Sequence, residues 1–262
     1  MRCALLFLCP MVLLCGCGKK AAPPPCFAAE TDTALTEAVS VMLLEVRQIM
    51  CVRLPEQFHP DMEQCIRNAE QGYAGTLLKC VTWQRTGADL TVSAVYAETP
   101  EHVRAMRQEL KYAVDGLAAG LRDFAPPVQI LLLHDNLISK CEYDADAPFS
   151  DSAYGVLQGA AVCGGYAEYF SLAAECCGIP ALTVSGFCCQ NGVYLPHAWN
   201  LVQLDGAWYH IDCTGDEGST PQHDLFLCTD TEMLHGYRWE QAAYPPADGT
   251  AYRYETIVQQ YF

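Results

Sequence analysis

One cysteine of the chain stands where a nucleophile would be activated. Cys163 is at the start of a run with helical periodicity, whose apolar positions are Ala167, Phe170, Ala173 and Ala174. The free amides and the dipole at the start of a helix lower the pKa of a thiol and favour the thiolate. Two glycines follow the cysteine and would let a substrate backbone come close to the sulfur. From this segment alone, a nucleophile and a small buried core residue are equally good interpretations.

A histidine and an aspartate follow on two segments that the sequence predicts as paired strands. The Asp-Gly dipeptide at 205–206 is typical of a two-residue hairpin turn. Counting outward from this turn places His197 and Asp212 as diagonal neighbours on one face of the ribbon, within hydrogen-bonding reach. The carboxylate would fix the tautomer of the imidazole, whose other nitrogen would take the proton of the Cys163 thiol. His210 lies on the same predicted face and could compete for Asp212, but we expect it to brace the sheet.

The resemblance to a known family rests on three segments: VCGGYAEYFSLAAECCGIPALTVSGF, HAWNLVQLDGAWYHIDCTGDE and LFLCTDTEMLHGYRW. They are similar to the transglutaminase-like core of bacterial surface proteins, a papain-related fold with the catalytic order Cys, His, Asp. The likeness covers roughly residues 126–240, about the size of one small domain. It implies that Cys163 is the nucleophile, His197 the general base and Asp212 its orienting partner.

The resemblance implies acyl transfer through a thioester at Cys163, on a protein or peptide substrate such as a cell-wall peptide. We favour hydrolysis, as in a peptidase or amidase, over crosslinking, because hydrolysis needs no second substrate pocket. The backbone amide of Cys163 is a natural oxyanion donor. Gln158, Tyr154 and Tyr166 are candidates for a second donor.

Two alternatives from other classes stay open. A non-catalytic surface module could use the same cleft to hold peptide or cell-wall material. A redox or metal protein built on the many cysteines is disfavoured, because adjacent pairs such as Cys176 with Cys177 lack the CxxC spacing of zinc sites. We expect no metal and no cofactor, since the segment GDEGS lacks the EF-hand pattern and the chain has no P-loop or dinucleotide-binding glycines.

The first residues predict export and lipidation. The stretch MRCALLFLCPMVLLCGC joins one arginine to an apolar run too short to span a bilayer, and then to small residues. Leu14, Gly16 and Cys17 resemble the lipobox of bacterial lipoproteins, in which the cysteine is lipidated and becomes the new N-terminus. We therefore expect Cys17 to anchor the protein at the outer face of a bacterial membrane. An uncleaved anchor and a plain secretory signal are the alternatives.

The charge balance excludes one class of partner. The chain has 31 acidic and 15 basic residues, a formal net charge of -16, and its lysines and arginines do not cluster. We therefore expect no nucleic acid as a partner. Of the 16 cysteines, those outside the signal and Cys163 are expected to be mostly small buried side chains, with one or two disulfides left open.

The fold class that we predict is α+β: a papain/transglutaminase-like core, with the cysteine helix packed on an antiparallel sheet, follows a smaller α/β N-terminal region. Helices are predicted at 31–50, 99–121 and 126–144, a hairpin at 75–97, and strands at 180–189, 195–204 and 207–214. The predicted divisions are a signal peptide with its lipobox (1–17), a tether (18–30), the N-terminal α/β region (31–125) and the catalytic domain (126–262).

Overall fold

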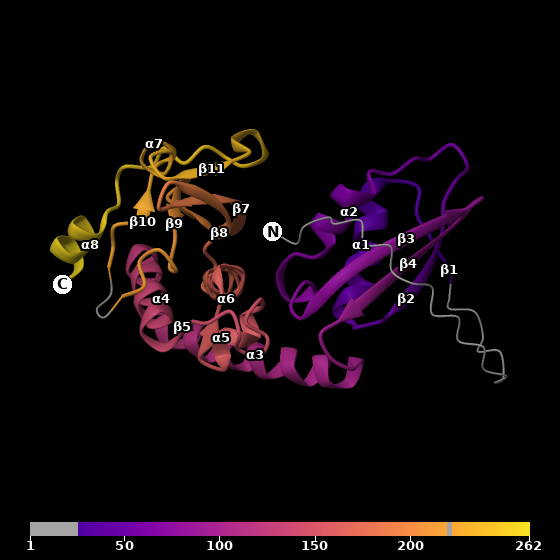
Figure 1. Cartoon of the computed structure of the whole chain (residues 1–262), viewed down its shortest axis with the longest axis horizontal. Helices are drawn as coiled ribbons and strands as arrows, with labels where there is room; N and C mark the ends of the chain where they lie inside the picture. Colours follow the sequence, from indigo (N-terminus) through magenta and orange to yellow (C-terminus); the bar gives the residue numbers. More distant parts are fainter. Residues whose placement is uncertain (1–25, 219–221) are drawn as a thin grey trace.

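The computed structural model describes residues 26–218 and 222–262 of the chain (Figure 1). The predicted signal peptide, the proposed lipidation site Cys17 and most of the predicted tether lie outside the described residues. Among the described helices, none has the length and hydrophobicity that crossing a bilayer requires.

The N-terminal part is a four-stranded sheet, in the order β1-β2-β4-β3, with short helices beside it. Its elements are β1 (Cys26–Ala28), α1 (Asp32–Leu44), β2 (Ile49–Arg53), α2 (Met62–Ala69), the 3-10 helix η1 (Gly72–Ala74), β3 (Leu78–Thr86) and β4 (Asp89–Tyr96). The predicted hairpin is β3 and β4, with Thr86 paired to Asp89 at its turn. β1 lies in the predicted tether, yet it pairs with β2 in parallel. The folded part therefore begins earlier than the sequence suggests.

The first helix ends well before the end of the predicted segment 31–50. Val46 takes a φ of 54° directly after the helix. Its N–H donates to the carbonyl oxygen of Leu43 at 3.1 Å, and the N–H of Arg47 donates to that of Met42 at 3.0 Å. This is the hydrogen-bond pattern that usually ends a helix at a glycine. Val46 is 1% exposed, so the burial of its side chain offsets the strained backbone.

The long helix α3 (Pro100–Leu121) belongs to both hydrophobic cores. Val103, near its start, packs with the side chains of the N-terminal sheet and of α1. Leu110, Val114 and Leu121, further along, pack with the C-terminal helices and sheet. In Figure 1, α3 runs along the bottom of the view, below both parts. The helix thus connects the two parts by packing as well as by the chain.

The C-terminal part contains an antiparallel five-stranded sheet, in the order β10-β9-β8-β7-β11. Its strands are β7 (Ala181–Gln190), β8 (Val193–Leu204), β9 (Ala207–Ile211), β10 (Phe226–Cys228) and β11 (Tyr237–Trp239). Around it lie α4 (Pro126–Lys140), α5 (Ala153–Leu157), α6 (Cys163–Cys176), α7 (Asp230–Met233), the 3-10 helix η2 (Gln241–Ala243) and α8 (Tyr254–Tyr261). A small parallel pair is formed by β5 (Glu142–Tyr143) and β6 (Ala160–Ala161). The predicted helix at 126–144 stops at Lys140, because the chain turns extended at Cys141 and enters β5.

α6 packs on one face of this sheet. The side-chain amide of Asn200 in β8 donates to the carbonyl oxygen of Ala167 and to Ser171 Oγ of the helix, each at 2.9 Å. Phe170 of α6 and Val202 of β8 lie in the same buried cluster. The predicted arrangement, a cysteine helix packed on an antiparallel sheet, is confirmed.

Polar contacts fasten α3 and α6 to the N-terminal part. Arg107 of α3 is 7% exposed. It donates hydrogen bonds to the carbonyl oxygens of Leu43 at 2.7 Å and of Thr76 at 2.7 and 2.9 Å. The hydroxyl of Thr76 donates to Glu168 of α6. The position of α6 is therefore set from two sides.

The cysteines are less buried than the sequence suggests. Those with described side chains differ in depth: Cys65, Cys141, Cys188, Cys213 and Cys228 are buried, Cys51, Cys163 and Cys177 are half-buried, and Cys80, Cys176 and Cys189 are exposed. Apart from Cys163, which the expectation left out, five of these ten cysteines are buried.

Candidate active site

The helix that carries the candidate nucleophile begins at Cys163, as the sequence predicts, and Val162 is its N-cap. The carbonyl oxygen of Val162 accepts hydrogen bonds from the N–H groups of Gly165 at 2.9 Å and Tyr166 at 3.1 Å. The N–H groups of the first turn have no partner further back in the helix, so the positive end of the helix dipole lies beside the thiol. Cys163 is half-buried, which shields its sulfur without enclosing it in the core.

The two glycines behind the cysteine have different functions. A Cβ on Gly165 would lie 2.7 Å from the carbonyl oxygens of both Ser150 and Ser152, so this glycine lets the preceding loop pack directly on the helix. The nearest atom to a Cβ on Gly164 is the carbonyl oxygen of Asp151, at 3.9 Å. The expectation that both glycines open the sulfur to a substrate is therefore wrong for Gly165. It remains an expectation for Gly164.

The histidine and the aspartate meet where the β8–β9 ribbon ends. Leu204 pairs with Ala207 across the turn, and this is the predicted register. His197 Nε2 lies 2.6 Å from Asp212 Oδ2, so the structure contains the hydrogen bond that the register predicts. Because Nε2 is occupied by the carboxylate, Nδ1 is the ring nitrogen left for the thiol of Cys163.

The carboxylate of Asp212 is 1% exposed and satisfied on both oxygens. Its Oδ1 accepts hydrogen bonds from the N–H of Thr214 at 3.1 Å, the hydroxyl of Thr214 at 2.7 Å and the N–H of Gly215 at 3.1 Å. Its Oδ2 accepts the hydroxyl of Tyr237 at 2.6 Å, besides the His197 ring. Burial alone would raise the pKa of Asp212, but the His197 bond and charge, with the Tyr237 and Thr214 bonds, lower it overall.

The imidazole of His197 is held as a cation. It is 8% exposed, and this burial by itself lowers its pKa. The hydrogen bonds and charges of Asp212 and Cys163 outweigh the burial and raise the pKa of His197 to about 10. The ring also stacks on Trp199, with the ring centres 6.0 Å apart, and this contact limits its rotation.

The thiol of Cys163 is correspondingly acidic. Burial raises its pKa, but the hydrogen bond and positive charge of His197 and the backbone amide of Ala198 lower it overall. The negative charge of Asp212 opposes this effect weakly, as the last of the contributions. Together the two shifts favour transfer of the proton from sulfur to imidazole, which gives a thiolate beside an imidazolium.

The contacts of two other residues, one predicted and one not, define their positions. His210 Nε2 lies 2.8 Å from Asp230 Oδ1, and its Nδ1 accepts the indole N–H of Trp199 at 2.9 Å. It therefore braces the sheet, as expected. Tyr237 belongs to the site, because its hydroxyl donates to Asp212. Its spacing in the sequence carries no signal, because β11 reaches the site by pairing with β7.

The two tyrosines among the candidate second oxyanion donors form hydrogen bonds outside the site. The hydroxyl of Tyr154 donates to Glu109 at 2.8 Å, and that of Tyr166 donates to the carbonyl oxygen of Cys141 at 2.7 Å. Gln158 lines a hollow together with Tyr154 and residues of α3.

The charge of the site affects a different tyrosine, Tyr143. Burial first, and then the negative charge of Cys163, raise the pKa of Tyr143. Tyr143 is 52% exposed, and in β5 it pairs with Ala161, two residues before Cys163. Its hydroxyl is thus a better candidate than those of Tyr154 and Tyr166 for contact with a bound substrate.

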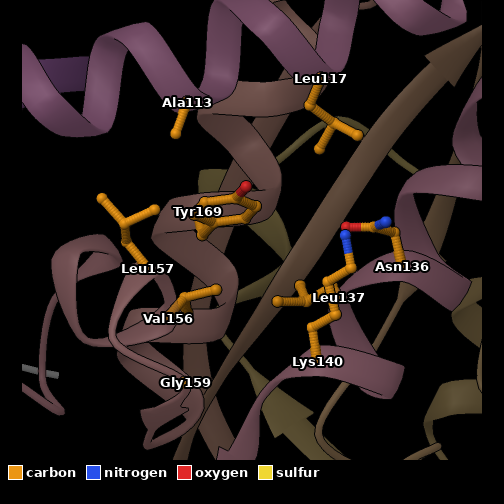
Figure 2. Close-up of a pocket in the computed structure, with 9 residues that line it drawn as sticks. All are labelled: Ala113, Leu117, Asn136, Leu137, Lys140, Val156, Leu157, Gly159 and Tyr169. Atoms are coloured by element: carbon orange, nitrogen blue, oxygen red, sulfur yellow. The ribbon is translucent and has the colours of Figure 1, made fainter.

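The hollow in Figure 2, of about 550 Å³, is separate from the three candidate residues. Side chains of α3, α4 and α6 line it, and Tyr169 lies between Leu117 and Leu157 in the view. A second hollow, of about 660 Å³, includes Tyr143 and Glu217, and so borders β5. Since β5 pairs with the strand that leads into Cys163, this second hollow is the better candidate for substrate contact.

Residues 118–213 match the family model of the transglutaminase-like superfamily. This segment is therefore similar to a transglutaminase-like core, and Cys163, His197 and Asp212 all lie within the matched residues. No curated protein matches the chain at a significant level.

Several solved structures are similar to this chain at low sequence identity. The crystal structure of a TGase has a TM-score of 0.36 and 14% identity, and the likeness covers 66% of this chain and 52% of that one. A candidate cysteine protease from Cytophaga hutchinsonii has a TM-score of 0.37 and 14% identity, covering 61% and 65%. A candidate protease from Parabacteroides distasonis has a TM-score of 0.31 and 11% identity, covering 68% and 41%. The present chain thus spans between 41% and 65% of the length of these proteins.

We expect Tyr237→Phe to destabilise the protein in a pH-dependent way. The substitution removes a hydrogen bond to a buried carboxylate, which contributes about 1.5–3 kcal/mol. The folded-state pKa of Asp212 is depressed, so its contribution is present above the unfolded pKa of about 3.9 and is lost as the pH falls through the folded-state value. The loss of unfolding free energy relative to wild type should therefore be largest at pH 7 and smaller in acid. Urea titrations at pH 7 and at an acidic pH measure it.

Tyr252→Phe is the matched control, because the hydroxyl of Tyr252 donates to the exposed carboxylate of Asp205. We expect this control to change stability by less than about 1 kcal/mol. An equal loss in both variants, or a loss for Tyr237→Phe that does not vary with pH, would contradict the proposed support of Asp212.

Proposed function

We propose that this protein is an exported, membrane-anchored cysteine enzyme that cleaves amide bonds in a protein or peptide substrate. The observation that carries the proposal is the buried Asp212–His197 hydrogen bond, next to a thiol whose pKa is lowered. The transglutaminase-like core supports it, since all three residues fall within the matched segment.

In the acylation half of the proposed reaction, the Cys163 thiolate attacks the carbonyl carbon of an amide. A carbon–sulfur bond forms, and the carbonyl electrons move to oxygen, where the amides of the first helical turn can stabilise the charge. The imidazolium of His197 then gives its proton to the leaving amine as the carbon–nitrogen bond breaks. Asp212 keeps its negative charge throughout and holds the ring.

In the second half, a water molecule attacks the thioester. His197, neutral after acylation, takes one proton of the water as the water oxygen bonds to the carbonyl carbon. The carbon–sulfur bond then breaks, and the thiolate is released beside the imidazolium, which keeps the proton. The products are a carboxylic acid and the free enzyme. The same intermediate would give a crosslink if a primary amine attacked in place of water.

Hydrolysis is the proposed outcome because it needs no second substrate pocket. We expect a peptide library incubated with the protein and a fluorescent primary amine to yield new carboxylates, and Cys163→Ala to yield none. Mass spectrometry distinguishes a new carboxylate from an amine adduct. Amine adducts as the main product would assign crosslinking instead.

We expect Cys163 to react with iodoacetamide well below the usual thiol pKa of about 8.5. The experiment uses a form that lacks residues 1–25, so that β1 is retained. Mass spectrometry across a pH series reads the labelled site. His197→Ala removes the charge that lowers the thiol pKa and should shift the labelling of Cys163 to higher pH.

His235→Ala is the control, since His235 is exposed and contacts the carbonyl oxygen of Glu232. It should leave the labelling profile unchanged. A Cys163 that stays inert in the folded protein would remove the acyl-transfer mechanism, and a non-catalytic module that holds peptide or cell-wall material would take its place.

The membrane anchor is proposed from the lipobox-like residues alone. We expect the full chain to enter the detergent phase in a partition assay, and Cys17→Ser to move to the aqueous phase, because the acyl chains supply the affinity. Cys15→Ser is the matched control, since Leu14 is too large for the residue before a lipidated cysteine, and it should behave as wild type. Equal partitioning of both variants would mean that Cys17 is not the lipidated residue.

A further inference from the structure

Two imidazoles and two carboxylates meet between α4 and the connection from β9 to β10. His134 Nδ1 lies 3.0 Å from Asp135 Oδ1, and His223 Nε2 lies 2.8 Å from the same oxygen. The other nitrogen of His134, Nε2, lies 3.2 Å from Asp216 Oδ2. The ligand atoms of His134, Asp135 and His223 all fall within 4.8 Å of one another.

A neutral His134 cannot donate a hydrogen bond to each of the two carboxylates beside it. A neutral imidazole has one N–H, so it cannot donate to carboxylates through both nitrogens. Asp216 is 1% exposed, and besides His134 its Oδ2 receives, among the described residues, only a contact of 3.2 Å from the N–H of Leu225, so the N–H of the imidazole belongs on Nε2. The lone pair of Nδ1 then faces the Asp135 oxygen at 3.0 Å. A positive charge between these two atoms would turn this repulsion into attraction.

We propose that His134 Nδ1, His223 Nε2 and an oxygen of Asp135 bind a divalent cation of the Zn²⁺ type. Two imidazoles and one carboxylate are a donor set that zinc uses in proteins, with a water molecule in the fourth position. In a tetrahedral site with bonds of about 2 Å, the ligand atoms lie about 3.3 Å apart. The two printed contacts, 2.8 and 3.0 Å, are close to this separation.

The surroundings fit such an ion in three ways. Asp216 accepts the outward N–H of His134, as a carboxylate commonly does for a histidine that binds a metal. Asp135 and Asp216 supply two negative charges, which balance those of the ion. Asp135 has a side-chain exposure of 34%, so an ion can enter from solvent and keep a water ligand.

No pattern in the sequence predicts this site. His134 and Asp135 are adjacent on α4, and His223 is 88 residues further along than Asp135. No short motif combines them, which is why the expectation of no metal followed from the sequence. Only the packing of α4 against the β9–β10 connection brings the three together.

The ion would fix the position of the β9–β10 connection, which begins with Asp212. The N–H of Asp216 donates to the carbonyl oxygen of Asp212 at 3.1 Å, and the N–H of Leu225 donates to Asp216 Oδ1 at 2.9 Å. Linking His223 to α4 through a metal therefore fixes both ends of this connection. The inference does not rest on the proposed enzymatic function, since a structural ion is equally compatible with a non-catalytic module.

The test uses the full chain purified in detergent, stripped with EDTA and reloaded with ZnCl₂. After desalting, the bound zinc is measured by mass spectrometry and the thermal midpoint by circular dichroism. We expect Asp135→Asn and His223→Gln each to retain one Zn²⁺ per chain fewer than wild type. Zinc at about 100 times its Kd should raise the midpoint of wild type by about 5–10 °C and leave these two variants unshifted.

The design controls for zinc bound by cysteine thiols, because all these proteins have the same cysteines. Both substituted residues are partly exposed, which avoids the folding risk of replacing the fully buried His134. His235→Gln, at an exposed histidine outside the cluster, should retain the zinc content and the midpoint shift of wild type. Equal zinc content in all four proteins, or no midpoint shift in wild type, would overturn the proposal and leave an extra proton on His134 as the bridging charge.

Discussion

The rest of the site depends on the burial of one negative charge, that of Asp212. Removing an ion from water costs several kcal/mol even after a protein relaxes around it. The cost is offset only if every lone pair finds a donor, and here the donors come from three places in the chain. Thr214 and Gly215 follow Asp212 directly, His197 comes from β8, and Tyr237 comes from β11 at the far side of the sheet. The carboxylate therefore fixes the position of the ring that it orients and of the strands that bring its donors.

The N-terminal part contributes to this arrangement through the helix that carries the thiol. Thr76 binds Glu168 of α6, and the other carboxylate oxygen of Glu168 accepts the N–H of Ala153 at 3.0 Å. Arg107 of α3 binds the carbonyl oxygen of the same Thr76. A side chain in the middle of α6 is thus bound from the loop between η1 and β3 and from α5. Because the helix is rigid, fixing its middle also fixes Cys163 at its start.

The sequence predicts the parts of this molecule that are encoded locally. The hairpin at 205–206 has a turn signal and α6 has helical periodicity, and from the register of the hairpin the approach of His197 to Asp212 could be predicted. The early end of α1 could not be predicted, because Val46 has no turn propensity and takes a positive φ only through its burial. Tyr237 was missed for a related reason: its contact with Asp212 depends on which strand pairs with β7, and strand order is a property of the whole sheet.

The order of residues in β8 places α6 on one face of the sheet and the side chain of His197 on the other. Side chains alternate along a strand, so His197 and Trp199 share one face, and Ala198 and Asn200 share the opposite face. Asn200 binds α6, so this second face is the helix side, and Ala198 lies on it two residues before Asn200. Ala198 is buried, and its backbone amide helps to lower the pKa of the Cys163 thiol. The Cys163 thiol therefore meets β8 at two successive residues, the backbone amide of Ala198 and the ring of His197, and both lower its pKa.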